Sequence, residues 1–230
     1  MHPVEPPADP PAREAYHHGA LRDALIAATE SLLAERGLEG FSLREVARRS
    51  GVSPAAPAHH FGDAQGLLTA VATLAFDGLT EALEAGNARG GDDAVARLRE
   101  QGVGYVDFAM KFPGRFSLMF RSGKPADEAL SRSAAAAFAA LENGVRELFG
   151  VAADEDLTPA QWQALLSIWS VVHGFAQLAL AGQLARFAPP GGREAMLRQV
   201  LAPMLEQQLR GLCARPAKPA PRRTGKPRPR

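Results

Sequence analysis

The side chains best placed to bind a partner lie in one short segment of the N-terminal third. Ser42, with Glu45 three residues later, has the capping-box pattern that starts a helix, and Gly51 is suited to end that helix. Ser53-Pro54 then has the pattern of an N-cap with proline at the first helical position, which predicts a second helix to about His60. Two short helices joined by a glycine turn are typical of a helix-turn-helix, whose second helix fits the major groove of B-DNA. The chemistry that this segment could perform is recognition of duplex DNA.

Residues suited to covalent or metal chemistry do not form a recognisable pattern. Cys213 is the single cysteine, so it cannot form an internal disulfide, and no Cys/His grouping has the spacing of a zinc site. The sequence also lacks a Ser/His/Asp signature, a Gly-rich phosphate loop, and paired carboxylates beside a histidine on one helical face. We therefore expect no enzyme activity, no metal and no cofactor.

The composition predicts a helical protein. Alanine and leucine supply 71 of the 230 residues, whereas valine, isoleucine and threonine supply 20, and unbranched side chains favour helices over strands. No apolar run approaches 18 residues and no charged start leads into an apolar segment, so we expect a cytoplasmic protein without a membrane span. The formal net charge is +1, but residues 215–230 carry seven Lys/Arg and no acid, so the rest of the chain is acidic.

Apolar periodicity and capping residues give the expected helices. The proline-rich ends, 1–12 and 214–230, have few apolar residues to bury and are expected to be unfolded. Residues 86–91 are expected to break the chain, because they contain three glycines. In the N-terminal part we expect one helix through Leu21 and Leu32 to Gly37, a second over 42–51 with Val46 and Ala47 facing inward, and a third over 53–60. A fourth helix is expected to be capped by Asp63 and to carry Leu67, Leu68, Val71 and Leu74. The later expected helices are 92–111, 114–121, 126–149, 159–182 with Thr158 as its cap, and 192–213.

The segment from Phe41 to Ser53, followed by His60-Phe61-Gly62-Asp63 and Gly66-Leu67-Leu68, resembles the TetR family of bacterial transcriptional regulators. The resemblance implies a three-helix DNA-binding domain over 13–66 and a helical domain over 67–213 that binds a small effector and dimerises. By resemblance, Ser42 and Arg44 lie where family members touch the phosphate backbone. The positions on or beside the groove-facing surface are Ser53, Pro54, Ala55, Ala56, His59 and His60.

The sequence departs from the family pattern in its charge. The family usually has a tyrosine where this chain has Ala58 and a lysine where it has Ala64, and both residues commonly hold phosphates. Residues 13–66 contain six arginines and seven acids, which is weak electrostatics for a duplex binder. One hypothesis is that the basic tail supplies part of the missing phosphate attraction; the alternative is a solubilising or unrelated tail.

A second resemblance lies in the C-terminal half. The segment Trp169-Ser170-Val171-Val172-His173-Gly174 looks like the Trp-His-Gly signature of one subgroup of TetR C-terminal domains. Trp169 and His173 are i, i+4 neighbours, so they are either a core pair or part of the wall of an effector pocket. The candidate ligand-binding residues are Tyr105, Phe108, Phe112, Phe116, Met119, Phe120, Trp169, His173 and Gln177.

The sequence therefore predicts an all-α fold of about nine helices, an N-terminal helix-turn-helix domain joined to a C-terminal helical domain. The resemblance implies that 159–182 and 192–213 pair with a second copy as a four-helix interface. The expected function is sequence-specific transcriptional regulation by a homodimeric repressor, bound to a palindromic DNA operator and released by a small, largely apolar effector. The alternatives are a helical ligand-binding or interaction module with weakened DNA binding and, less favoured, an enzyme.

Overall fold

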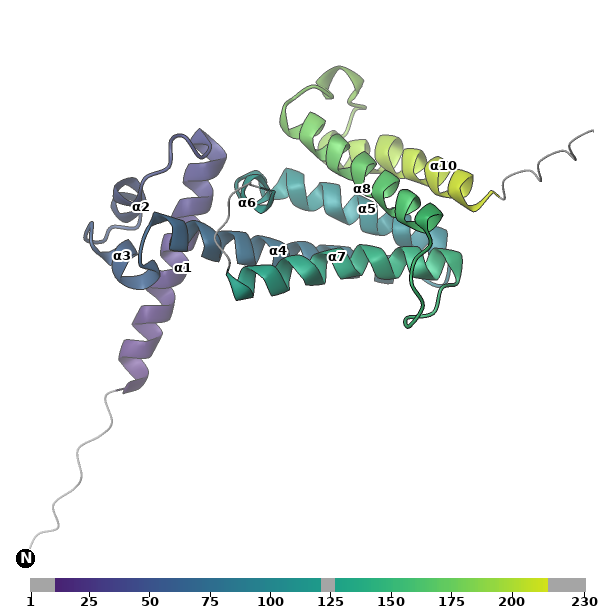
Figure 1. Ribbon diagram of the computed structural model, residues 1–230. Helices are drawn as coiled ribbons and strands as arrows, with labels where there is room; N and C mark the ends of the chain where they lie inside the picture. The colour runs from purple at the N-terminus through teal and green to yellow at the C-terminus, as the bar shows by residue number, and fades with distance from the viewer. Residues whose placement is uncertain (1–10, 121–126, 215–230) are drawn as a thin grey trace, which may run out of the picture.

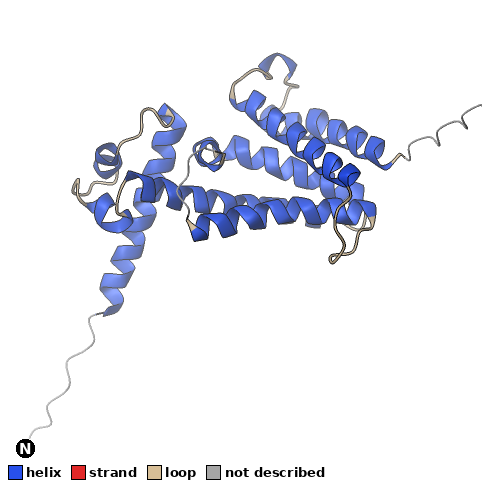
Figure 2. Ribbon diagram, in the orientation of Figure 1, coloured by secondary structure: helices blue, strands red, loops and turns tan. Residues whose placement is uncertain are grey.

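The computed structural model describes residues 11–120 and 127–214, and every regular element within those residues is a helix (Figures 1 and 2). The elements are α1 (Pro11–Arg36), α2 (Leu43–Arg49), α3 (Ala56–Phe61), α4 (Ala64–Arg89), α5 (Ala94–Lys111), α6 (Pro113–Met119), α7 (Glu128–Phe149), α8 (Pro159–Leu180), the 3₁₀ turn η1 (Ala185–Phe187), α9 (Gly192–Ala195), the π-helical turn η2 (Met196–Leu201) and α10 (Ala202–Cys213). The expected all-α fold is confirmed.

The helices form a small N-terminal group and a larger bundle, and α4 belongs to both. In Figure 1, α1, α2 and α3 lie together at one end of the molecule, and α4 runs from them into the bundle with α5, α7, α8 and α10. One hydrophobic core runs through both parts, from Leu25 of α1 and Val46 of α2 to Leu205 of α10. A smaller core around Leu165 and Leu209 closes the far end of the bundle. The expected boundary after residue 66 falls inside α4.

Two limits of the long helices differ from the expectation. Helix α1 begins at Pro11, within the stretch expected to be unfolded. Helix α4 continues through Gly86 to Arg89, so the break expected over 86–91 begins only at Gly90. The reason is the crossing of α4 and α5: a Cβ at Gly86 would lie 2.5 Å from the carbonyl oxygen of Glu100. Gly86 therefore allows the two backbones to touch rather than ending the helix.

The starts of α4 and α8 agree with the capping residues. Asp63 accepts a hydrogen bond from the backbone N–H of Gly66, 2.8 Å away, and caps α4 as expected. Thr158 and Gln161 form a complete capping box at the start of α8. The segments α9, η2 and α10 follow one another without a gap from Gly192 to Cys213, as one expected helix.

Helices α4 and α8 are long and apolar enough, by length and composition alone, to cross a membrane. Both also supply buried residues to the bundle, including Ala75 of α4 and Leu165 of α8. A core helix passes the same test, so this observation is weak evidence for a membrane span.

Candidate nucleic-acid interface and ligand cavity

Helix α2 begins where the sequence indicates, but its first turn carries an ion pair. The Ser42 hydroxyl accepts a hydrogen bond from the backbone N–H of Glu45, and Val46 and Ala47 are buried. The carboxylate of Glu45 does not return to the N-cap; it accepts from Arg48 Nε at 2.8 Å and from Arg49 Nε at 3.1 Å. The expected capping box is therefore formed on the Ser42 side only.

Helix α3 begins later than expected. Gly51 has the positive φ of 67° that a tight turn requires, as expected for this position. The prediction that Ser53 caps α3 is wrong: Ser53 and Pro54 lie in the turn, and Ala55 is the N-cap, without a side-chain bond. The cause is Pro57, which has no N–H and is tolerated only in a first turn, so the helix starts at Ala56 and places Pro57 second.

The outward face of α3 consists of short side chains and one imidazole. Ala55, Ala58 and His59 are exposed and, at spacing i, i+3 and i+4, lie on one face of the helix. Pro57 is buried, and Phe61 packs against the core with the Arg22 guanidinium 5.3 Å from its ring centre. The eight positions assigned to DNA contact differ in exposure. Ser42, Arg44, Ser53, Pro54, Ala55 and His59 are exposed, and Ala56 and His60 are half-buried.

Two of the three arginines of α2 are engaged by acids. Arg49 bridges α1 and α2, with Nη2 2.7 Å from a carboxylate oxygen of Glu35. Hydrogen bonds from Arg49 lower the pKa of Glu35 to about 2, and hydrogen bonds from Arg48, then Arg49, lower the pKa of Glu45 to about 2. Arg44 is exposed and has no ion pair with any described residue. It is therefore the α2 cation that is available to a phosphate.

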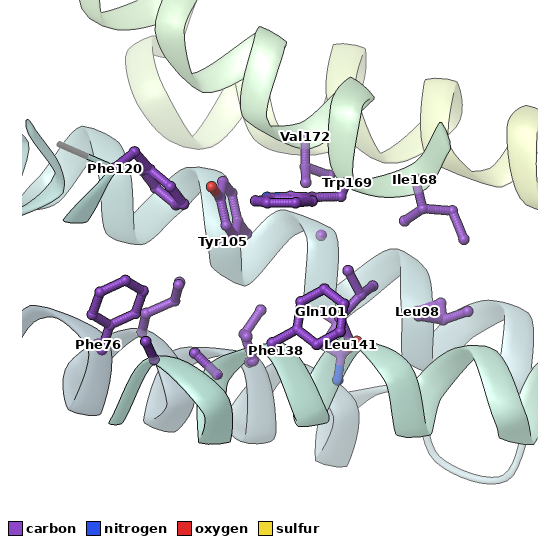
Figure 3. A pocket seen from close by; sticks show the side chains of 15 residues that line it. Phe76, Leu98, Gln101, Tyr105, Phe120, Phe138, Leu141, Ile168, Trp169 and Val172 are labelled. Carbon is purple, nitrogen blue, oxygen red and sulfur yellow. The ribbon is translucent and has the colours of Figure 1, made fainter. Parts of the chain in front are cut away.

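A cavity of about 230 Å³ lies inside the bundle, between α4, α5, α7 and α8 (Figure 3). No charged side chain among the described residues lines it. Figure 3 shows Phe76 and Phe120 at one end, Leu98 and Ile168 at the other, and Trp169 between them. The lining residues are Phe76, Leu79, Leu83, Leu98, Gln101, Gly102, Tyr105, Phe120, Ala134, Ala137, Phe138, Leu141, Ile168, Trp169 and Val172.

The polar groups beside the cavity are mostly paired with one another. The Tyr105 hydroxyl lies 2.8 Å from Nδ1 of His173, and the Gln177 amide lies 3.3 Å from Nε2 of the same ring. Burial raises the pKa of Tyr105 and lowers the pKa of His173, so both groups are neutral at pH 7.

Three of the nine candidate ligand residues, Tyr105, Phe120 and Trp169, line the cavity. The other six lie elsewhere. His173 packs behind the wall, with its ring centre 4.6 Å from that of Phe120, and Gln177 is exposed one turn further along α8. Phe116 and Met119 are buried in the core. Phe108 and Phe112 contact each other at the junction of α5 and α6, outside the cavity lining.

Sequence reasoning missed the lining residues of α4 and α7. The α7 side of the wall is formed by Ala134, Ala137, Phe138 and Leu141. Their spacing of i, i+3, i+4 and i+7 is the signal that could have identified this helix face. On α4 the corresponding residues are Phe76, Leu79 and Leu83.

Helices α8 and α10 also present apolar side chains to the outside. Leu166 and Leu178 of α8 are 51% and 48% exposed, and Met204 of α10 is 43% exposed. Gln208 of α10 donates a hydrogen bond to Ser167 of α8 at 2.9 Å, which fixes the two helices side by side. Large apolar side chains left outside on two neighbouring helices are typical of a protein interface.

Comparison with known proteins agrees with this arrangement. Residues 25–71 match the family model of bacterial regulatory proteins of the tetR family, and residues 98–204 match the model of a tetracycline-repressor-like C-terminal domain. The matched C-terminal model does not identify the Trp-His-Gly subgroup, which stays a prediction.

Individual relatives show the same likeness. The chain is 36% identical over 78 residues to the HTH-type transcriptional regulator BetI of Stenotrophomonas maltophilia (strain R551-3), a match that spans 34% of this chain and 40% of that protein. A protein of unknown function from Rhodococcus sp. RHA1 is 33% identical to this chain and superposes with a TM-score of 0.69. The match covers 86% of this chain and 98% of the Rhodococcus chain. The TetR family transcriptional regulator PfmR from Thermus thermophilus shares the fold at 20% identity, with 86% and 97% coverage and a TM-score of 0.56. The chain belongs to the TetR family of bacterial transcriptional regulators.

Proposed function

We propose that this protein is a homodimeric repressor that binds a palindromic operator and is released when a small, uncharged, largely apolar effector enters the α4, α5, α7 and α8 cavity. The observation that carries the proposal is the continuity of α4. Its first turns pack against α1 and α3, and its later turns supply Phe76, Leu79 and Leu83 to the cavity wall. A displacement of the cavity wall is therefore transmitted through α4 to α3, the helix expected to enter the major groove.

Helix α6 provides a second route between the two parts. Gly114 lies so close to α1 that a Cβ there would be 2.5 Å from the Glu30 carbonyl oxygen. Arg115 Nε lies 2.6 Å from a carboxylate oxygen of Glu30. Phe120, which directly follows α6, is part of the cavity wall. An effector that moves Phe120 thus acts on α1 as well as on α4.

The cavity restricts the chemistry of the effector. Transfer of an unpaired charge into a site without a charged partner is strongly unfavourable, so the effector is uncharged. A cavity of about 150 Å³ holds benzene, so about 230 Å³ suits a molecule with one or two rings. The aromatic lining favours a planar ligand.

The exposed face of α8 and α10 supports the homodimer. Burial of Leu166, Leu178 and Met204 against a second copy would remove apolar surface from water. To read both halves of a palindrome, a two-fold dimer must hold its two copies of α3 about 34 Å apart, one turn of B-DNA. The ligand then acts by favouring a state in which this spacing is wrong.

Selection from random double-stranded DNA at about 0.15 M salt tests the DNA-binding part. An enriched palindrome supports a dimeric regulator, whereas binding that depends on salt but not on sequence contradicts it and favours the alternative of an interaction module with weakened DNA binding.

The effector part is tested by filling the cavity. Ala137→Phe places a ring in the cavity and is expected to abolish release by any effector while operator binding persists. Ala136→Phe makes the same change at the exposed neighbouring position of α7 and is the control. An Ala137→Phe protein that is released as readily as wild type contradicts an effector site in this cavity.

A further inference from the structure

One polar atom at the cavity wall lacks a partner. The side chain of Gln101 is 3% exposed and lines the cavity from α5. Its amide nitrogen donates to the carbonyl oxygen of Ala140 in α7 at 3.0 Å. Its oxygen, Oε1, is buried without a hydrogen bond to any described residue. Buried polar atoms are nearly always paired, so an unpaired one beside a cavity points to a missing partner.

The neighbouring polar groups show that this atom differs from the rest of the wall. The Tyr105 hydroxyl already pairs with His173. The bond to Ala140 identifies which atom of the Gln101 amide is the oxygen, because the reversed amide would place two acceptor oxygens opposite each other. The missing partner is therefore a hydrogen-bond donor.

The position of Gln101 indicates where on the ligand the donor lies. Gln101 reaches α7 at Ala140, which precedes the lining residue Leu141, and in Figure 3 it lies between the aromatic end of the cavity and its aliphatic end. Oε1 lies beside Gly144, where a Cβ would be 3.1 Å from it. Oε1 is buried, so contact with a ligand requires the terminal amide to turn toward the cavity.

We infer that the effector is an uncharged ring compound with a hydroxyl or N–H group that donates to Gln101 Oε1. This inference rests on the proposed function, in which the cavity binds the effector. It makes Gln101 the residue that separates a donor-bearing ligand from an apolar molecule of the same shape. A site built around a polar group discriminates strongly against an analogue that leaves the group unpaired.

Binding of two ring compounds of equal size to the full-length protein tests this. The probes are 2-naphthol and 2-methylnaphthalene, which differ by a hydroxyl in place of a methyl, and affinity is measured by calorimetry. We expect wild type to bind 2-naphthol at least about tenfold tighter, although the methyl compound is the more hydrophobic. In Gln101→Met, an unbranched apolar side chain of similar length, the preference is expected to reverse. Gln199→Met makes the same change at an exposed helical position and keeps the wild-type preference.

A second variant covers a failure of Gln101→Met to fold. Gln101→Leu also removes the amide and puts a branched apolar side chain in its place, so it is likewise expected to lose the preference for 2-naphthol. Equal binding of the two probes by wild type, or a preference for 2-naphthol that persists in both variants, overturns the inference. Either result is still compatible with an effector site in this cavity. Binding of neither probe by wild type overturns the inference together with the effector part of the proposed function, while the selected operator still stands.

Discussion

The contact between α6 and α1 gives the sharpest prediction about stability and coupling. In Gly114→Ala the new Cβ would lie 2.5 Å from the Glu30 carbonyl oxygen and 3.0 Å from the Ala34 nitrogen. Both neighbours are backbone atoms of one helix, so they cannot rotate away. Since ordinary contact begins near 3.4 Å, α6 must move away from α1 by nearly 1 Å.

The cost of this movement can be set against the gain in helix propensity. Overpacking of a close contact costs about 1–3 kcal/mol, and alanine in place of a helical glycine returns at most about 1 kcal/mol. We expect a net loss of about 1–2 kcal/mol in the free energy of unfolding, or a fall of about 2–8 °C in Tm for a chain of this size.

Urea unfolding followed by circular dichroism measures the loss. The matched control is Gly19→Ala, a helical position where a Cβ would meet no described atom within 4 Å, and this variant is expected to be as stable as wild type or slightly more. If α6 transmits the state of the cavity to α1, Gly114→Ala also reduces the effect of a bound ring compound on operator affinity. A Gly114→Ala protein as stable as Gly19→Ala refutes the close packing of α6 on α1.

Four further outcomes are expected. Residues 50–62 contain no Arg, Lys, Asn or Gln, so this segment is expected to recognise thymine methyl groups through short side chains such as Ala55. Replacing one contacted thymine by uracil removes a methyl group and should weaken operator binding about fourfold. The same replacement at a flanking thymine is the control. Deletion of residues 215–230, which lie outside the described residues, should weaken binding to every DNA sequence and reduce its salt dependence. Unchanged affinity would contradict the hypothesis that the basic tail attracts the DNA phosphates. The pKa of Glu35 is lowered from 4.5 to about 2 by Arg49, so its contribution to stability is present above about pH 4.5 and is lost as pH falls toward 2; Glu35→Gln should flatten acid unfolding over that range. Leu166→Glu should convert the proposed dimer to monomers in sedimentation, and a dimer that persists places the interface elsewhere.

The local signals in the sequence were sufficient for most of the fold. Ser42, Asp63 and Thr158 cap the helices that they were expected to cap, because a side-chain oxygen satisfies backbone donors at that position wherever the helix packs. The start of α3 was missed because two prolines compete to set it, and Pro57 fixes the start since only a first turn tolerates its missing N–H. Gly86 was misread because its role depends on α5, which crosses α4 there.

The candidate ligand residues of α5 and α6 were chosen as one aromatic series, although the sequence predicts a break between the two helices at Pro113-Gly114. From Tyr105 to Phe120 the aromatic residues would share a face only if the helix continued. It ends at Phe112, whose φ of −128° and ψ of 59° are not helical, and Pro113 starts α6. The bend directs Phe116 into the core and returns only Phe120 to the cavity.

The cavity itself could not be read from any one helix, because it is the space that four helices leave between them. Ala134 and Ala137 of α7 have the periodicity of ordinary core residues, and their short side chains leave volume only because Trp169 of α8 and Tyr105 of α5 lie across from them. The same argument applies to Gln101, which in the sequence is one polar residue on an otherwise apolar face. Its unpaired oxygen becomes informative only once α7 is seen to pair with the nitrogen of the amide and not with the oxygen. Helix positions are therefore predictable from local capping and periodicity, whereas ligand chemistry depends on which polar atoms the packing leaves without a partner.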